Sequence, residues 1–528
     1  MRLSRICIRQ KGLINMAKKL IAVIDIGSIT ARIKIFEVNA KGKPKEIEAV
    51  RKFTGLGSRS YSSGTIAPDQ VDELCKCLKM FDEKCREYGV ARVFCVATSA
   101  FRDASNSEVV LEKVRTRTGF KIKVLDNSME RYYQTLAVQA IYPDFAKMIE
   151  GGTMMLDIGS GSIQASVYDK SEFVFSQNMV LGSLRISGLL ADLENRTTHY
   201  DDVLEEFIAQ DLDDYHAVEP KGITYKNLIA FSGEMGFVKV LLGRDAMDSC
   251  VLTKDEFLKV YDYLLKTRPS DLTLHDSIPS MIAPLLLPTA LIIKNMLEYT
   301  GVDSIYMPHA SLSDGIVYYY CYNNLDLKPS VDPDSYMISA ARQMAKRYRC
   351  DRKHIELVEK TALRIFDETR KTSGLGNRDR LLLQIAVNLH EIGKFVHSRN
   401  HSDAAYSIIS YTNMMGLNSE EQHMVAMVVR LYPRENPYGS HFYSILPSDQ
   451  KVIVSKLTSI LRIADAIDAS HKEKAKKITV TSKPDRLSIN CESPQDMTFE
   501  EWAFENRCGL FEDVMGIKAV LKTRREIL

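Results

Sequence analysis

Two absences narrow the range of functions open to this chain. Its 528 residues include ten cysteines, yet Cys75 and Cys77 are the only close pair and no C-x-x-C occurs. A zinc ribbon or a dithiol redox site therefore has almost no support, and we expect reduced thiols in a cytoplasmic protein. The formal net charge is only +2, so no overall basic field indicates nucleic acid as a partner. A polyanionic ligand would have to be held by a local group of arginines and lysines.

The chain also lacks an apolar run of the roughly 20 residues that a membrane-spanning helix needs. The longest candidate runs from Ile278 to Ile293, contains three prolines and stops at Lys294. We expect a buried core helix there and no contact with a membrane. Residues 1–15 are basic and have no apolar segment of the secretory type, so we expect them to be disordered or to precede the natural start.

Two apolar runs end in the same four residues. Leu20 to Ile24 leads into Asp25-Ile-Gly-Ser28, and Met154 to Leu156 leads into Asp157-Ile-Gly-Ser-Gly-Ser162. A second β-like stretch follows each turn. A duplicated strand–turn–strand unit predicts two structurally related lobes.

Strands and helices alternate around the first repeat, which predicts an α/β sheet. Helical periodicity dominates from about residue 332 to 471, and β signals return after residue 478 with a helix near 499–516. The helices and strands expected in the first lobe are a helix at 68–88, a strand at 93–97, a helix after 106, a strand at 121–125 and a helix at 128–140. The predicted divisions are 1–15, a first lobe at 16–140, a second lobe at 141–325, a helical domain at 332–472 and a small α+β domain at 473–528.

The repeated turns have the chemistry of phosphate-binding loops. Glycine lets the backbone approach a ligand closely, and exposed N–H groups with a serine hydroxyl form a concavity for an anion. The aspartate at the end of each strand can hold a hydrated Mg²⁺, directly or through water. The two aspartates are 132 residues apart in matching contexts, so the turns can face each other and grip a phosphate chain from both sides.

The pair of turns resembles the phosphate loops of the superfamily of actin, heat-shock chaperones and sugar kinases, which implies an actin-like (ribonuclease-H-like) two-lobed fold. More narrowly, residues 97–106 (Ala-Thr-Ser-Ala-Phe-Arg-Asp-Ala-Ser-Asn) are similar to Ala-Thr-Ser-Ala-x-Arg-Asp-Ala-x-Asn of the exopolyphosphatase and guanosine-pentaphosphate phosphohydrolase family. We expect Arg102 to face the cleft and Asn106 to cap the next helix. The alternative is a surface pair of Arg102 and Asp103 beside a capping asparagine.

Two further segments follow in the family's order. Met129-Glu130-Arg131 stands at the place of the family's Glu-Glu-Ala, and Gly182-Ser-Leu-Arg185 resembles Gly-Ala-Val-Arg. The resemblance implies metal-assisted hydrolysis of a terminal phosphoanhydride, in inorganic polyphosphate or guanosine pentaphosphate, by a protein that is often a homodimer. Glu130 would orient or deprotonate the attacking water, unless it is an ordinary glutamate on an exposed helix face. Asp157, together with Asp25, would hold Mg²⁺ or Mn²⁺. The residues expected to bind phosphate are Gly27, Ser28, Arg102, Asn106, Gly159, Ser160, Gly161, Ser162 and Arg185.

Several positions depart from the family pattern. In the second loop Ser160 replaces a glycine, and Gln164 replaces a carboxylate expected at the metal, so we expect a lower affinity for Mg²⁺. Ile29 stands where an asparagine is common, and Ser313 stands where an arginine is expected. These losses keep open a catalytically impaired sensor of polyphosphate or nucleotide. An actin-like kinase or ATPase is a third alternative, which Ser232-Gly-Glu234 supports poorly because a glycine pair is expected there.

The helical domain carries histidines and carboxylates at spacings typical of HD-type phosphohydrolases, which implies an HD-like domain. Glu391 stands where an aspartate normally bridges two metals, and its extra methylene displaces the carboxylate. We therefore favour a structural or polyphosphate-binding role over a second active site. The candidate ligands are His354, His390, Glu391, His401 and Asp465. Basic residues that either extend a substrate groove or form a solvated helix face are Lys346, Arg347, Arg349, Arg352, Lys353 and Arg430.

Overall fold

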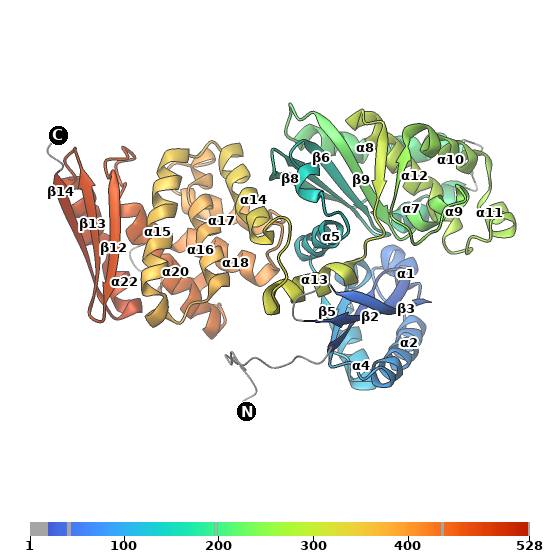
Figure 1. The fold of residues 1–528 in the computed structure, drawn as a ribbon, viewed down its shortest axis with the longest axis horizontal. Helices are drawn as coiled ribbons and strands as arrows, with labels where there is room; N and C mark the ends of the chain where they lie inside the picture. Colours follow the sequence, from blue (N-terminus) through green and yellow to red (C-terminus); the bar gives the residue numbers. More distant parts are fainter. Residues whose placement is uncertain (1–18, 40–43, 195, 198, 435–437, 526–528) are drawn as a thin grey trace.

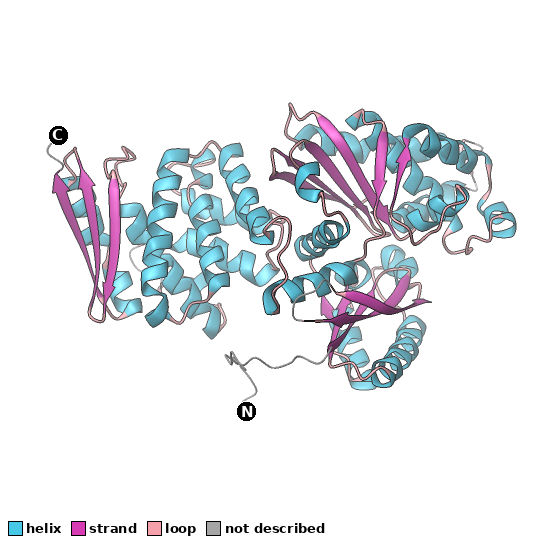
Figure 2. Ribbon diagram, viewed as in Figure 1, coloured by secondary structure: helices cyan, strands magenta, loops and turns pink. Residues whose placement is uncertain are grey.

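The computed structural model describes residues 19–39, 44–194, 196–197, 199–434 and 438–525. The first predicted segment, 1–15, lies outside the described residues. Two separate sheets, a helical bundle and a small third sheet follow one another along the chain (Figure 1). Figure 2 shows that the strands form these three groups and that helices occupy the region between the second and third.

The first sheet has the strand order β3-β2-β1-β4-β5, with β1 antiparallel to β2 and parallel to β4. Helices pack around this sheet, and the chain then continues into the second sheet. Its strands are β1 (Lys19–Ile26), β2 (Thr30–Val38), β3 (Lys45–Phe53), β4 (Arg92–Ala97) and β5 (Lys123–Val124). The helices of this part are α1 (Leu56–Ser63), α2 (Pro68–Glu87), α3 (Ser99–Asp103), α4 (Ser107–Thr118), α5 (Asn127–Ile141) and α6 (Phe145–Met148).

The second sheet has the order β10-β11-β9-β6-β7-β8, in which β6 is antiparallel to β7 and parallel to β9. The run β3-β2-β1-β4 of the first sheet thus reappears as β8-β7-β6-β9, which confirms the duplicated strand–turn–strand unit. Its strands are β6 (Gly152–Ile158), β7 (Ile163–Asp169), β8 (Glu172–Met179), β9 (Tyr225–Ser232), β10 (Cys250–Thr253) and β11 (Ser304–Met307). The helices are α7 (Ser183–Glu194), α8 (Tyr200–Val218), α9 (Met235–Leu241), α10 (Lys254–Lys266), α11 (Pro269–His275) and α12 (Ala283–Thr300).

The apolar run from Ile278 to Ile293 was predicted to be a core helix, and from Ala283 onward it forms α12, most of whose residues are buried. Pro284 fits its first turn, where a backbone N–H is not needed, and Pro288 lies inside the helix. Within the described parts of the chain, no helix has the combination of length and apolar character needed to cross a bilayer.

Helices α5 and α13 (Leu312–Asn324) pack against each other between the two sheets (Figure 1). Helix α13 also contacts β1 and β2, although its sequence position falls in the proposed second lobe. Helix α5 also contacts the helical domain, since Ser128 Oγ donates to the carbonyl oxygen of Leu417 at 2.5 Å. The two sheets and the helical domain therefore meet at α5.

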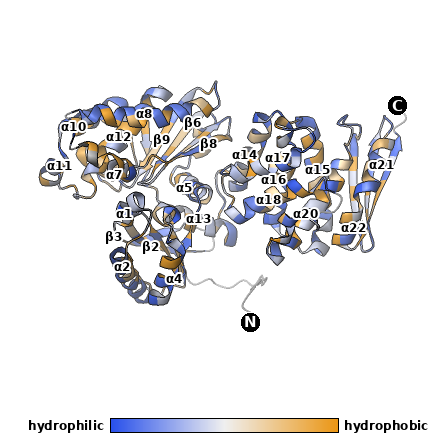
Figure 3. Cartoon of the chain, turned by 180° about the vertical axis from the view of Figure 1, so that it is seen from behind, coloured by the Kyte–Doolittle hydropathy of each residue, from blue (hydrophilic) through white to orange (hydrophobic). Residues whose placement is uncertain are grey.

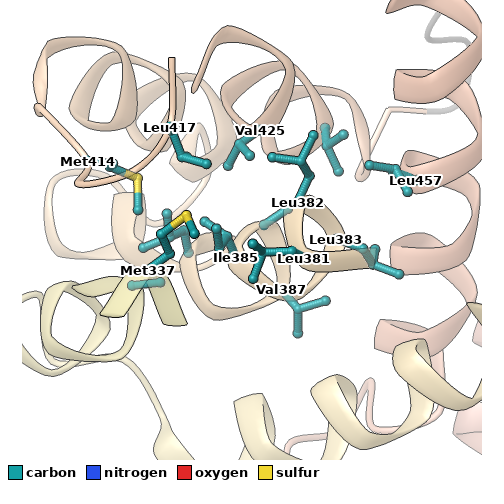
Figure 4. Close-up of a cluster of buried hydrophobic side chains, with 14 of the residues drawn as sticks. Met337, Leu381, Leu382, Leu383, Ile385, Val387, Met414, Leu417, Val425 and Leu457 are labelled. Carbon is teal, nitrogen blue, oxygen red and sulfur yellow. The ribbon is translucent and has the colours of Figure 1, made fainter. Parts of the chain in front are cut away.

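The apolar core of the helical domain is continuous with buried residues of both lobes and of the last sheet. Figure 4 shows Leu382 and Ile385 of α16 among side chains from α14, α18 and α20. Figure 3 shows polar and apolar residues mixed along these helices, as expected when one face is buried. The elements are α14 (Pro333–Arg347), α15 (Arg352–Ser373), α16 (Asn377–Leu389), η1 (Ile392–Phe395), α17 (His401–Tyr411), α18 (Ser419–Leu431), α19 (His441–Ser444) and α20 (Ser448–Ala466).

The last part is a three-stranded sheet, β12-β13-β14, with two helices on it. The single helix expected near 499–516 is two helices, α21 and α22, separated by Cys508, which ends the first and precedes the second. The elements are β12 (Lys477–Lys483), β13 (Arg486–Ser493), α21 (Thr498–Arg507), α22 (Gly509–Met515) and β14 (Lys518–Arg525).

The core of the helical domain gives a direct test of this packing. Leu457 of α20 is fully buried, so Leu457→Ala should lower the free energy of unfolding of this domain by about 2–5 kcal/mol through lost contacts and a cavity. Val452→Ala, on the same helix but half exposed, should change it by less than about 0.5 kcal/mol. Urea unfolding followed by circular dichroism measures both, and equal losses would contradict the packing.

Candidate functional site between the two lobes

A cavity of about 430 Å³ lies between the two sheets, where β1 and β6 end. Both Asp-Ile-Gly-Ser turns line it, and so does Glu130 of α5. The fold thus gathers around one cavity residues that are far apart in the sequence. The predicted site residues that line it are Asp25, Gly27, Ser28, Glu130, Asp157, Gly159 and Ser160.

Four acidic side chains share the cavity. Burial raises the pKa of Asp25 to about 6, even though Arg32 opposes the shift. Burial also raises the pKa of Asp157 well above its ordinary value, and the charges of Glu130 and Glu234 add to the shift. The pKa of Glu234 is raised by burial as well. Repulsion among buried carboxylates is relieved by a bound cation, and carboxylate oxygens are the ligands that Mg²⁺ prefers. The donor set therefore fits a divalent cation.

The strand registers place matching rows of side chains on the two sheets. On the first sheet Asp25 lies opposite Arg32, which lies opposite Arg51. All three line the cavity, so this row presents one acid and two guanidinium groups to it. Burial lowers the pKa of Arg51 to about 10, with Arg32 adding to the shift. A guanidinium with that pKa is still charged at neutral pH and can bind phosphate oxygens.

On the second sheet the equivalent row is Asp157, Gln164 and Asn178. Directly opposed residues of antiparallel strands share one face, so both amides lie on the face that carries Asp157. Gln164 is buried, and its Oε1 has no hydrogen-bond partner among the described residues. The first sheet therefore supplies positive charge to the cavity, and the second supplies the carboxylate of Asp157, whose neighbours in the row are amides outside the cavity lining.

Tight packing fixes the two turns relative to each other. The hydroxyl of Tyr61 on α1 lies 2.5 Å from Ser28 Oγ and 2.8 Å from Ser99 Oγ. A Cβ at Gly161 would lie 2.1 Å from that same hydroxyl, and a Cβ at Gly182 would lie 2.3 Å from the backbone of the second turn. Neither position has room for a side chain, so the glycines let the second loop approach the first lobe closely.

Several predicted ligands lie outside the cavity wall. The Arg102 guanidinium donates to Glu130 Oε2 at 3.0 Å and to the Leu125 carbonyl at 2.6 Å, so it holds the glutamate instead of facing open space. The Arg185 Nε donates to the carbonyl of Gly161 at 3.0 Å, and its guanidinium lies over the Tyr61 ring. Both arginines thus support the site from behind. Gly161 and Ser162 also lie behind the wall, beyond Ser160.

The prediction that Asn106 caps the next helix is wrong. It stands at the first position before α4, but its side chain makes no capping hydrogen bond. Its Oδ1 accepts from the Ile66 N–H at 3.0 Å, and its Nδ2 donates to the Ile66 carbonyl at 2.9 Å. Both polar atoms are committed to one backbone segment, so Asn106 fastens the chain before α2 and does not reach the cavity.

Several side chains at the cavity were not predicted from the sequence. Arg32 and Lys34 alternate along the otherwise apolar strand β2, and this spacing was the available signal because both face the same side. Lys34 is buried and ion-paired with Asp314 of α13 at 3.0 Å. Tyr61 and Arg51 come from segments without any recognisable pattern, so only the fold could show them.

The helical domain brings part of its predicted group together. One ligand atom from each of His354, His390 and Glu391 lies within 4.8 Å of the others. Asp465 joins them, with its Oδ1 3.2 Å from His354 Nε2. His401 instead lies against Tyr432, at 2.9 Å from the hydroxyl.

The carboxylates of this group already have cationic partners. Lys394 contacts Glu391, and Arg507 Nη1 donates to Asp465 at 2.5 Å. Burial disfavours the charged form of His354, but hydrogen bonds to Asp465 and Asp468 raise its pKa to about 9. The group has metal-ligand chemistry, yet its acids are neutralised by neighbouring side chains.

The fold defines an actin-like, two-lobed protein with a cavity between the lobes, followed by a helical domain. Comparison with family models gives a narrower assignment: residues 35–322 match the Ppx/GppA phosphatase family, and residues 338–505 match domain III of Ppx/GppA phosphatases. The chain belongs to the Ppx/GppA phosphatase family. This confirms the resemblance drawn from residues 97–106 and the paired turns.

Two kinds of relatives are similar to the chain. Guanosine-5'-triphosphate,3'-diphosphate pyrophosphatase of Aliivibrio fischeri is 21% identical over 485 residues, covering 89% of this chain and 91% of the relative. Exopolyphosphatase 1 of Mycobacterium tuberculosis is 31% identical over 167 residues, which are 32% of this chain and 47% of the relative.

Solved structures support the fold. A Ppx/GppA family protein of Aquifex aeolicus is 22% identical, with a TM-score of 0.50 and coverage of 59% of this chain and 100% of that chain. An exopolyphosphatase of Cytophaga hutchinsonii is 20% identical, with a TM-score of 0.51 and coverage of 58% and 98%. These similarities establish the actin-like fold of the two lobes.

The close packing behind the second turn can be tested with two glycines. Gly182→Ala should displace the turn and destabilise the protein by about 1–3 kcal/mol, because its Cβ would overlap the backbone of the turn. Gly188→Ala in α7 has open space around the added methyl and should be neutral or stabilising by up to about 1 kcal/mol. Thermal unfolding and binding of a phosphate compound measure both. Equal behaviour of the two variants would refute the packing argument.

Proposed function

We propose that the chain hydrolyses terminal phosphoanhydride bonds of inorganic polyphosphate, with guanosine pentaphosphate as the other candidate substrate. The observation that carries this proposal is the cavity, where Glu130 and both Asp-Ile-Gly-Ser turns face a row of guanidinium groups. The names of the relatives support both substrates, since one is a guanosine-5'-triphosphate,3'-diphosphate pyrophosphatase and the other an exopolyphosphatase.

The residues of the cavity suit in-line attack of water on a phosphate. Glu130 is held by Arg102 and can orient a water molecule and accept its proton. Arg32 and Arg51 offset the charge that develops on the phosphate oxygens, and the N–H groups near Ser28 and Ser160 cradle the chain. This is the pattern of phosphoryl transfer, in which positioning and charge neutralisation supply most of the rate enhancement.

Family phosphatases generally depend on a divalent metal. In this chain Asp157 and Asp25 would hold Mg²⁺ or Mn²⁺, with Glu234 as a further buried carboxylate of the cavity. When bound, the cation would neutralise phosphate oxygens. Glu234 was not among the predicted ligands. It belongs to Ser232-Gly-Glu234, where a kinase would be expected to have a glycine pair for adenosine.

A sensor that binds polyphosphate or nucleotide without cleaving it is the second candidate. The observation that favours it is Gln164, whose neutral amide lies opposite Asp157 in place of a carboxylate.

For the helical domain we propose a structural or polyphosphate-binding role, because Lys394 and Arg507 already neutralise its acids. A homodimer in the cytoplasm completes the proposal, and the free cysteines of the described residues agree with a reducing compartment.

Hydrolysis is tested by phosphate release from long-chain polyphosphate and from guanosine pentaphosphate, with Mg²⁺ or Mn²⁺. Glu130→Ala should lower the rate by about 10²–10⁴-fold, since it removes the group that orients water. Glu150→Ala, at an exposed glutamate, is the matched control and should leave the rate unchanged. Tight polyphosphate binding by the wild type without release of phosphate would establish the sensor and reject the enzyme.

Restoring a carboxylate at position 164 tests the metal assignment. Gln164→Glu should lower the Mg²⁺ concentration for half-maximal rate by about fivefold or more, because a second negative charge then lies beside Asp157. Without metal, repulsion between the two acids should lower the melting temperature, and Mg²⁺ should restore it. Gln210→Glu on the exposed side of α8 is the control. An unchanged Mg²⁺ requirement would place the cation away from this row.

A further inference from the structure

A second, larger cavity of about 760 Å³ lies between strand β8 and the helical domain. Its walls are the β7–β8 hairpin, the loop after α8, helix α14 and the segment from Tyr411 to Met415. None of the residues assigned above to hydrolysis lines it. The cavity therefore needs an explanation of its own.

The floor of this cavity is a buried guanidinium. Arg131 is 1% exposed, and its Nη1 donates to Ser176 Oγ at 2.5 Å. Its Nε and Nη2 have no hydrogen-bond partner among the described residues. Burial lowers the pKa of Arg131 to about 10, although the charges of Glu130 and Asp157 oppose the shift. A buried charge of this kind is normally paired, so these two N–H groups can donate to an anion.

Other groups around Arg131 also lack partners. Asn178 Oδ1, next to Ser176 on the same strand, and Ser166 Oγ, opposite Ser176, are buried without a hydrogen-bond partner. An asparagine amide can turn to present its NH₂ group, and a serine hydroxyl can donate. Arg131 and Asn178 line the cavity and can both donate to one anion, while Ser166 lies behind its wall.

The residues that line the cavity carry an excess of positive charge. Five basic and two acidic side chains line it, and one of the acids, Glu172, already accepts from Gln343 Nε2 at 3.0 Å. Tyr411 also lines the cavity with 90% of its surface exposed, so an aromatic ring is available beside the basic residues. The basic side chains are Arg131, Lys170, Lys221, Lys346 and Arg347, and the acidic ones are Asp169 and Glu172.

We propose that this cavity is a second anion site, in which Arg131 binds a phosphate group of a small phosphorylated molecule. Two sources share this chemistry: an inorganic phosphate compound, and a nucleotide whose base stacks on the ring at position 411. Because Glu130 lines the first cavity and Arg131 lines the second, one helix, α5, forms a wall of both. The site is defined by binding and stands whether or not the first cavity hydrolyses its substrate.

A fluorescent reporter placed at the rim tests the site directly. The chain has one tryptophan, so Trp502→Phe combined with Tyr411→Trp leaves a single indole at this cavity. Titration with pyrophosphate, and separately with GDP, in EDTA should give a saturable change in fluorescence. Equal affinity for the two probes assigns the site to phosphate alone, and tighter binding of GDP assigns a base contact at position 411.

The variants make this result specific. Arg131→Met in the reporter protein should weaken binding by about tenfold or more, because it removes the buried charge. Should Arg131→Met fail to fold, the exposed pair Lys346→Glu and Arg347→Glu should weaken binding by a similar factor. Lys360→Met, at an exposed lysine outside the cavity, should leave the affinity unchanged. The absence of a saturable signal, or a signal that these cavity variants do not alter, would overturn the proposal.

Discussion

The carboxylate of Asp126 fixes helix α5, and through α5 it fixes the arrangement of the whole molecule. One oxygen caps α5 by accepting from the Met129 N–H at 3.0 Å, and the other accepts from the Ser419 N–H at 2.9 Å. A cap of this type contributes about 1 kcal/mol to a helix, and here the same group also joins α5 to α18. Because Glu130 is in the first turn of α5, the helical domain helps to set where the glutamate stands in the cavity.

The duplicated unit gives the two lobes the same geometry and different electrostatics. Each sheet presents an aspartate at the end of its central strand, but the neighbouring positions of the row are arginines in the first lobe and amides in the second. A phosphate group in the cavity would be attracted to the first lobe, and the carboxylate of the second would share a cation with it. A phosphate chain between the turns would thus be held by direct charge on one side and by backbone N–H groups and a cation on the other.

The sequence was most informative where the chemistry is local. The paired turns, residues 97–106 and the apolar run from Ile278 to Ile293 each have a pattern that lies within one segment. The structure shows the turns after β1 and β6, residues 97–106 between β4 and α4, and α12 over most of the apolar run. The roles of Asn106 and Arg102 could not be predicted, because each is decided by a distant partner, Ile66 or Glu130. The row of Arg32 and Arg51 is likewise a matter of register between strands, which sequence spacing alone does not determine.

Two departures from the family pattern act in the same direction at the first cavity. Gln164 removes a negative charge from the row of Asp157, and Arg131 adds a positive charge that interacts with the same aspartate. Both changes make the surroundings of Asp157 less negative, so both reduce the attraction for a cation there. An anion bound to Arg131 would offset the positive charge that this guanidinium adds near Asp157. The unpartnered guanidinium and the missing carboxylate are therefore linked through Asp157, and occupancy of the second cavity would favour a cation in the first.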